Sequence, residues 1–113
     1  MRYASFNVLA DAYTSYGDYS HTTPGLMQPG ARLGHLSRQI NSLNADVVGL
    51  QEADRALVEV FEGDVDWQSF WTPKGHDKPD GCLTLIKRGV EVADHKSYAY
   101  DDESGHVLQV TQI

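Results

Sequence analysis

The pattern of apolar and polar residues predicts a strand, a helix and a second strand at the start of the chain. Residues 5–9 (SFNVL) and 47–51 (VVGLQ) are short apolar runs. Between them, apolar residues spaced three or four apart predict a helix over residues 31–43, and Asn44 is placed to end it. A short run after a helix is typical of a strand buried on both faces. Together these segments predict an α/β unit, in which Asn7 and Glu52 lie at neighbouring strand ends.

A second helix and several strands are predicted downstream. Apolar positions over residues 54–62 fall on one helical stripe, and Asp54 is suited to cap that helix. The Asp80-Gly81 pair is a turn signal. Apolar and β-branched residues then alternate or cluster in four segments, which predicts strands at 68–72, 82–87, 91–100 and 106–113. Three tyrosines within the turn-rich stretch 10–30 predict a packed loop there.

Length and composition limit the class of protein. A chain of 113 residues with 41% hydrophobic and 22% charged residues corresponds to one ordinary globular domain. No apolar run approaches the ~20 residues that cross a bilayer, and the first residues lack a signal-peptide core. Cys82 is the one cysteine, which fits a reducing compartment. We therefore expect a cytoplasmic protein with no membrane partner.

The charge balance disfavours a passive nucleic-acid binder. Sixteen acidic residues against nine Lys and Arg give a net charge of −7. Proteins that bind nucleic acid without sequence preference use basic stripes to neutralise phosphates, and this chain has none. An acidic protein still processes nucleic acid when its carboxylates hold metal ions that meet the phosphate.

Three residues are candidates for chemistry. Glu52 follows a predicted buried strand, where a carboxylate suits Mg²⁺ or Mn²⁺, although capping of the next helix is the commoner role. Asn7, a polar residue within an apolar strand, either orients a catalytic carboxylate or contacts a phosphate, or it is a buried amide that only holds two strands together. Lys74 lies in a loop where it can meet a phosphate, whereas Lys78 is expected to be solvated. Cys82 is expected to be a small core residue.

Four segments in a fixed order resemble the endonuclease/exonuclease/phosphatase superfamily. They are SFNVLAD, the region of Arg32 that opens the first helix, ADVVGLQE, and FWTPK followed by PDGCLTLIKR. The lysine followed by Asp-Gly-Cys is similar to the deadenylase-like branch, which includes Ccr-type deadenylases, nocturnin, Angel and 2′-phosphodiesterases. No one of these segments is specific alone, but their combination is.

The resemblance implies a fold and an activity. The fold is an α/β sandwich, with two sheets packed face to face and helices outside. The activity is Mg²⁺-dependent hydrolysis of a phosphoester, with Mn²⁺ as an alternative ion, acting on RNA 3′ ends or a nucleotide. By the same resemblance Glu52 binds the metal directly, Asn7 supports the metal and the scissile phosphate, and Lys74 contacts a substrate phosphate.

The resemblance covers only the N-terminal half of the family's domain. The family's later motifs, a histidine-bearing strand, an Asp-x-Asn pair and a Ser-Asp-His, do not occur after Lys87. We therefore expect residues 1–113 to be a half-domain that continues beyond 113, is inactive alone and needs a complementary C-terminal half. Two alternatives remain open: a non-catalytic interaction module, and a phosphatase of cyclic phosphates or phosphomonoesters. The downstream sequence distinguishes the module from the enzyme.

Overall fold

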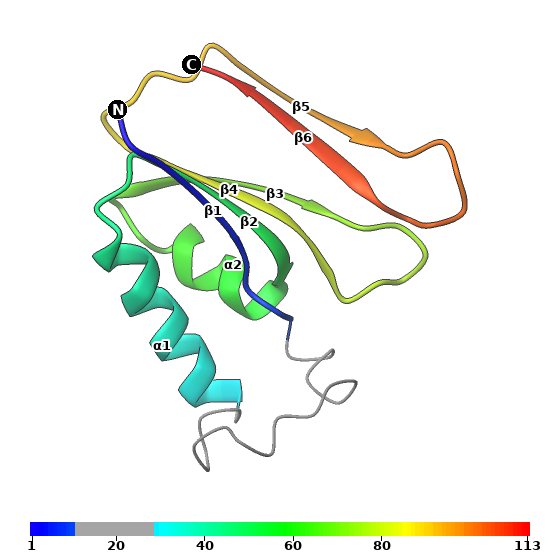
Figure 1. Cartoon of the computed structure of the whole chain (residues 1–113), viewed down its shortest axis with the longest axis horizontal. Coiled ribbons are helices and arrows are strands. Elements are labelled where there is room, and N and C mark those ends of the chain that lie inside the picture. Colours follow the sequence, from blue (N-terminus) through cyan, green and yellow to red (C-terminus); the bar gives the residue numbers. More distant parts are fainter. Residues whose placement is uncertain (11–28) are drawn as a thin grey trace.

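The computed structural model describes residues 1–10 and 29–113, so the predicted tyrosine-rich loop lies outside the described residues. Within these described residues, two helices and six strands follow one another (Figure 1). In order, they are β1 (Tyr3–Asn7), α1 (Pro29–Ser42), β2 (Val47–Asp54), α2 (Arg55–Glu62), β3 (Trp67–Pro73), β4 (Asp80–Lys87), β5 (Asp94–Ala99) and β6 (Val107–Gln112).

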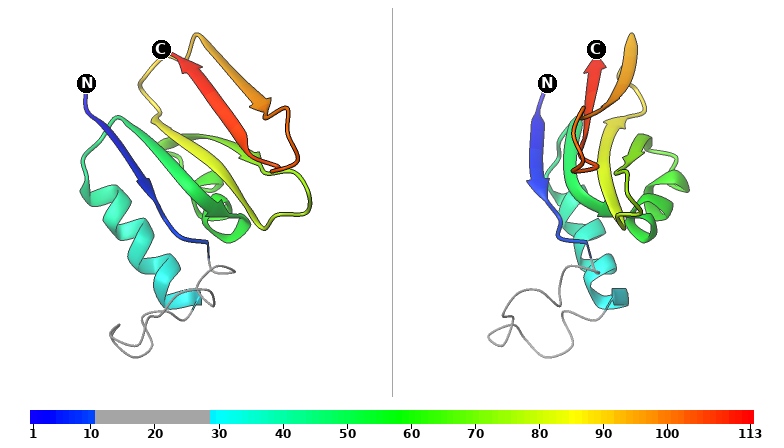
Figure 2. Two further views of the ribbon diagram at one scale, coloured as in Figure 1. Left: turned by 45° about the vertical axis from the view of Figure 1, so that its right-hand side comes forward. Right: turned by 90° about the vertical axis from the view of Figure 1, so that its right-hand side faces the viewer.

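The strands form a four-stranded sheet and a separate hairpin. The sheet has the order β1-β2-β4-β3, and the hairpin pairs β5 with β6. The β1–β2 pair is parallel and the other pairs are antiparallel. Figures 1 and 2 show both helices on one side of the sheet and the hairpin on the other. The predicted fold class, an α/β arrangement of two facing sheets with helices outside, is confirmed.

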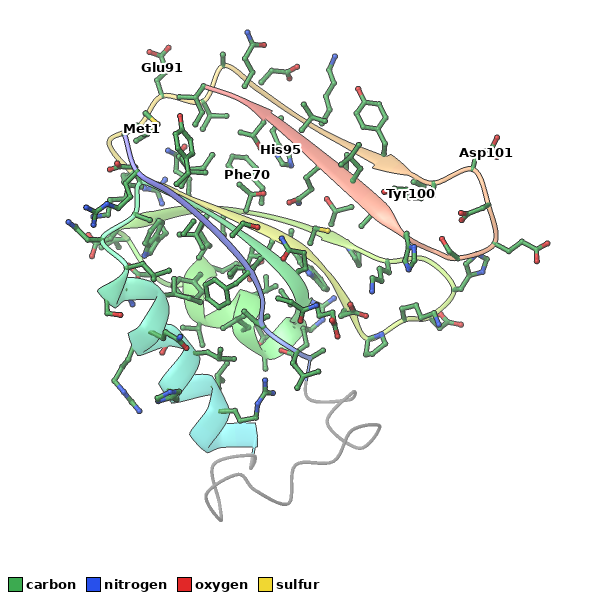
Figure 3. The ribbon with its side chains drawn as sticks, viewed as in Figure 1. Met1, Phe70, Glu91, His95, Tyr100 and Asp101 are labelled. Carbon is green, nitrogen blue, oxygen red and sulfur yellow. The ribbon has the colours of Figure 1, made fainter. Side chains whose placement is uncertain are left out.

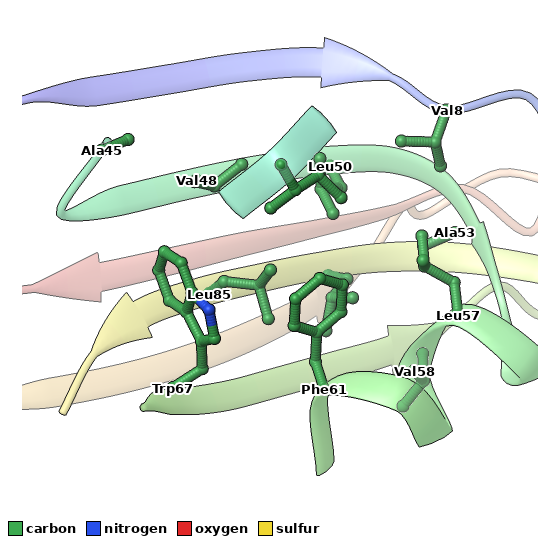
Figure 4. Packing of buried hydrophobic residues seen from close by; sticks show 12 residues of the cluster. Val8, Ala45, Val48, Leu50, Ala53, Leu57, Val58, Phe61, Trp67 and Leu85 are labelled. Carbon is green, nitrogen blue, oxygen red and sulfur yellow. The ribbon is translucent and has the colours of Figure 1, made fainter. Parts of the chain in front are cut away.

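The apolar core lies between the four-stranded sheet and the helices (Figure 4). Val48 and Leu50 point into it and are at most 1% exposed, whereas Val47 and Gly49 on the other face of β2 are only half-buried. The prediction that this strand is buried on both faces was therefore wrong. The hairpin covers mainly β3 and β4, so β2 has an apolar side and an incompletely covered side.

Polar side chains join the hairpin to the sheet. The side-chain amide of Gln109 accepts a hydrogen bond from Thr84 Oγ1 at 2.7 Å and donates to Phe70 O and Thr72 Oγ1, both at 2.9 Å. Phe70 also stacks on the His95 ring, with centroids 4.4 Å apart, in the space between the two sheets (Figure 3). The outward face of the hairpin is the apolar one, because Tyr98, Leu108 and Val110 are about half exposed.

The Asp80-Gly81 pair, predicted as a turn, instead begins β4. Gly81 pairs with Pro73, and the two backbones approach so closely that a Cβ on Gly81 would lie 2.1 Å from Thr72 O. Only glycine fits this position without moving the chain. Gly81, which is a turn signal in the sequence, instead permits two strands to pair closely. As a result Asp80 lies within the sheet and has no exposed surface.

Candidate active site at one edge of the sheet

The strand directions bring the three predicted site residues to one edge of the sheet. Strands β1, β2 and β3 run the same way, while β4 runs against them. Asn7 ends β1, Glu52 lies near the end of β2, and Lys74 directly follows β3. The carboxyl ends of such strands are where open α/β sheets bind ligands.

Asn7 and Glu52 contact each other directly. Asn7 pairs with Gln51 in the β1–β2 ladder, and its Nδ2 donates a hydrogen bond to Glu52 Oε2. The other end of the amide accepts a hydrogen bond from Leu9 N at 2.8 Å, which fixes the orientation of Asn7. The prediction that Asn7 and Glu52 lie at neighbouring strand ends is confirmed. Their roles stay predictions.

The backbone at Glu52 adopts an uncommon conformation. Its φ is +55°, in the left-handed region that residues other than glycine seldom occupy. The β2–β4 register shifts between Leu50 and Ala53, so Glu52 lies in a bulge. A bulge redirects a side chain away from the normal alternation of the strand. Backbone strain of this kind concentrates at functional sites, and here it turns the carboxylate toward Asn7.

The helix-capping role belongs to Asp54, as the sequence predicted, and not to Glu52. Asp54 has extended backbone angles and its Oδ1 accepts a hydrogen bond from Leu57 N at 3.1 Å. A side-chain acceptor at this position satisfies one of the amides that the first helical turn leaves without a partner. Glu52 is therefore not needed to start α2.

We expect Asp54→Ala to destabilise the fold by about 1 kcal/mol, the usual cost of losing an N-cap. The acceptor for the Leu57 amide disappears, while the Asn7–Glu52 contact stays in place. Urea unfolding followed by tryptophan fluorescence measures the change. An effect below about 0.3 kcal/mol would mean that the cap contributes little here.

Hydrogen bonds connect helix α1 to the segment that follows β1. The guanidinium of Arg32 donates hydrogen bonds to Val8 O at 2.7 Å and Leu9 O at 2.6 Å. A cavity of about 10 Å³ lies beside these residues, bounded also by Glu52 and Asp54. This volume holds about one water molecule.

Lys74 forms an ion pair that was not predicted from the sequence. Its Nζ lies 2.8 Å from Asp80 Oδ2, and the two side chains are 19% and 0% exposed, respectively. A backbone hydrogen bond of 3.0 Å from Lys74 N to Asp80 O closes the same hairpin. Lys78, in contrast, is exposed, as predicted. Asp80 was not among the residues predicted from the sequence. The one feature that pointed to it was an acidic residue at the start of an apolar strand, shortly after a lysine.

Cys82 borders this ion pair and behaves as a packed thiol. Burial raises the pKa of the Cys82 thiol, the nearby Lys74 charge lowers it, and Asp80 raises it again. Its Sγ lies 3.8 Å from Val107 O, on the side that faces the hairpin. A thiol with a raised pKa is a poor nucleophile, so this environment favours the predicted structural role.

A family model described as the Endonuclease/Exonuclease/phosphatase family matches residues 4–112. The chain belongs to the endonuclease/exonuclease/phosphatase family. A search of curated proteins finds no match to it. Within residues 1–10 and 29–113, no helix is long and apolar enough to cross a membrane.

Solved structures of other proteins share this fold. ANGEL2, a 2′,3′-cyclic phosphatase crystallised with adenosine-2′,3′-vanadate, matches 96% of this chain with a TM-score of 0.71 and 18% identity. The human Nocturnin catalytic domain, with bound sulfate, matches 86% with a TM-score of 0.63 and 19% identity. A Bacteroides vulgatus member matches 91%, also with a TM-score of 0.63 and 19% identity. The chain spans 36–38% of the length of these three chains.

The donor set at this edge fits part of a magnesium site. Mg²⁺ is usually bound by one or two carboxylates together with waters and substrate phosphate. Glu52 supplies one such carboxylate, and among the described residues its Oε1 accepts no hydrogen bond. The described part of the chain holds no cluster of three or more His, Cys, Asp or Glu side chains placed to bind a metal. Among the described residues, Glu52 is therefore the one carboxylate at this edge whose chemistry suits such an ion.

Proposed function

We propose that this chain forms the metal- and phosphate-binding half of a Mg²⁺-dependent phosphodiesterase, with Mn²⁺ as an alternative ion. The observation that carries the proposal is the Asn7–Glu52 contact, made by a carboxylate in a strained bulge at the carboxyl ends of two parallel strands. Family membership supports the reaction class, and the separate cap at Asp54 leaves Glu52 available for chemistry.

In this proposal each residue has a distinct task. Glu52 holds the ion through its carboxylate, and Asn7 keeps that carboxylate oriented through its own fixed amide. A divalent ion bound there supplies the positive charge that polarises a phosphoryl oxygen. Lys74 attracts a phosphate of the substrate as a compact point charge. The chain contributes mainly position and electrostatics, which are the main protein contributions to phosphoryl transfer.

The net charge of −7 supports a metal-dependent mode of substrate binding. RNA and nucleotides are themselves anionic, so an acidic protein without a basic stripe repels them at long range. A divalent ion at Glu52 would offset this repulsion locally. We propose RNA 3′ ends or a nucleotide as the substrate, acted on in the cytoplasm.

A second candidate substrate is a cyclic phosphate. The supporting observation is the match to ANGEL2, whose structure is that of a 2′,3′-cyclic phosphatase and covers 96% of this chain. Both candidates need the same residues at the sheet edge. Parallel assays with an RNA oligonucleotide that ends in a 3′-hydroxyl and with one that ends in a 2′,3′-cyclic phosphate separate them.

We expect the 113-residue chain alone to show no measurable phosphodiesterase activity. One carboxylate does not hold a catalytic metal in position, and the described residues offer no larger ligand cluster. We propose that a complementary C-terminal half supplies the remaining ligands and the general base. The measurement is release of labelled nucleotide in the presence of Mg²⁺, compared with a metal-only control.

The same assay with a complementary half tests the proposal further. Residues 1–113 are co-expressed with a segment that corresponds to the rest of a family domain, and metal-dependent cleavage is expected to appear. Turnover by the chain alone above the metal-only control would overturn the half-domain proposal. No turnover in the co-expressed complex, once the complex is shown to form, would favour the non-catalytic module.

A further inference from the structure

We propose that Asp80 is a positioning residue, which holds the Lys74 ammonium at a fixed place and so determines where a substrate phosphate binds. This inference rests on the proposed function, because it assigns Lys74 to a phosphate of RNA or of a nucleotide. It adds a residue that makes no contact with the substrate itself. The structure of the β3–β4 hairpin carries the argument.

The first observation is the burial of Asp80. Its side chain has no exposed surface, although it stands at the very start of β4. An ionised carboxylate in such surroundings is costly unless a charged partner and hydrogen bonds compensate it. Lys74, at 2.8 Å, is that partner. The position of the Lys74 ammonium therefore depends on the position of Asp80, which strand β4 determines.

The second observation is that the backbone prevents the pair from shifting. Lys74 N donates to Asp80 O at 3.0 Å, and the next register pair is Pro73 with Gly81. At Gly81 the two strands are too close for any Cβ, since Thr72 O would lie 2.1 Å away. The relative positions of the two side chains are thus determined by the strand pairing and not by a flexible loop.

The third observation is that Lys74 still reaches solvent. Its side chain is 19% exposed while that of Asp80 is fully covered, so the ion pair has a closed side and an open side. The ion pair holds the Lys74 side chain in one rotamer before a phosphate binds at the sheet edge. Less conformational freedom is then lost on binding than for an unrestrained lysine such as the exposed Lys78.

Removing the charge of Asp80 distinguishes a positioning role of this residue from a purely electrostatic effect on phosphate binding. A carboxylate 2.8 Å from the ammonium repels an incoming anion, so by Coulomb's law alone Asp80→Asn should tighten phosphate binding. If Asp80 positions Lys74, the same change should weaken binding, because the ammonium loses its fixed place. The two readings predict opposite signs.

The test is a titration of the ¹⁵N-labelled 113-residue chain with inorganic phosphate at constant ionic strength. The chain has four lysines, so each side-chain ammonium signal is assigned with single Lys→Arg variants. In the natural chain, phosphate should shift the Lys74 signal and leave Lys78 unchanged. Asp80→Asn should raise the apparent Kd about threefold or more, and Lys78→Ala should leave it as it was. Asp80→Glu keeps the charge and moves the ammonium, so it should weaken binding as well.

Each outcome decides one question. Equal or tighter binding by folded Asp80→Asn, or natural affinity in Asp80→Glu, would overturn the positioning role and leave the proposed function standing. A natural chain whose Lys74 signal does not respond to phosphate would overturn the assignment of Lys74 itself, and the positioning role with it. If Asp80→Asn does not fold, the Asp80→Glu titration decides between the two readings.

Discussion

Replacing Glu52 with glutamine in the completed domain is expected to lower kcat/KM at least about a thousandfold, the scale seen when a key electrostatic contact to the reacting group is lost. Glutamine keeps the shape of the side chain and an oxygen that accepts the hydrogen bond from Asn7 Nδ2. It removes the negative charge that the proposal assigns to the metal. Steady-state hydrolysis at several Mg²⁺ concentrations measures the loss.

Binding of Mn²⁺ to the completed domain, followed by electron paramagnetic resonance, gives a second measurement. Glu52→Gln should weaken it, while Glu59→Gln is the matched control, because Glu59 is exposed on α2. Near-normal turnover in Glu52→Gln, with only a modest loss of stability, would show that the carboxylate serves the fold and not the reaction.

Replacing Lys74 with alanine is expected to destabilise the fold by about 3 kcal/mol, at the low end of the cost of breaking a buried ion pair because Lys74 is 19% exposed. The change leaves the carboxylate of Asp80 covered and without its ammonium. Urea unfolding of the 113-residue chain gives the free energy. In a completed enzyme, KM should also rise with little change in kcat, since a phosphate contact made in ground and transition states alike affects binding.

The control for Lys74→Ala is Lys78→Ala, in the same loop and exposed. It should change stability by less than about 0.5 kcal/mol. A double-mutant cycle with Asp80→Ala isolates the pair: most of the cost of Lys74→Ala should disappear once Asp80 is also gone. Equal effects of the two lysine substitutions would mean that the loop contributes only general charge.

The sequence predicted the Asn7–Glu52 edge because local patterns were enough for it. Two short apolar runs joined by an amphipathic helix imply parallel strands, and parallel strands end at the same edge. The Asp54 cap followed from residue type and position. Asn44, predicted to end α1, adopts a left-handed φ of +51° two residues after the helix. Each of these inferences depends on residues close together in the chain.

The Lys74–Asp80 pair could not be predicted in the same way. Aspartate followed by glycine favours a turn because of local backbone preferences. Here the contact between β3 and β4 outweighs that preference, since Gly81 permits a close approach and Lys74 compensates the buried charge. The bulge at Glu52 likewise could not be predicted from the sequence, because it results from the register between β2 and β4. Both features depend on pairing between distant segments.

The polar contact between the hairpin and the sheet has a consequence for how the chain opens. Hydrogen bonds of the kind that Gln109 makes contribute only about 0.5–1.5 kcal/mol each, because water replaces them readily. Beneath the sheet, by contrast, Leu50, Phe61 and Leu85 are almost completely removed from water. We therefore expect the hairpin to be a separate cooperative unit, which detaches from the sheet at a lower free energy than the helix-covered sheet needs to unfold. Strands β5 and β6 can leave while the edge that carries Asn7 and Glu52 stays folded.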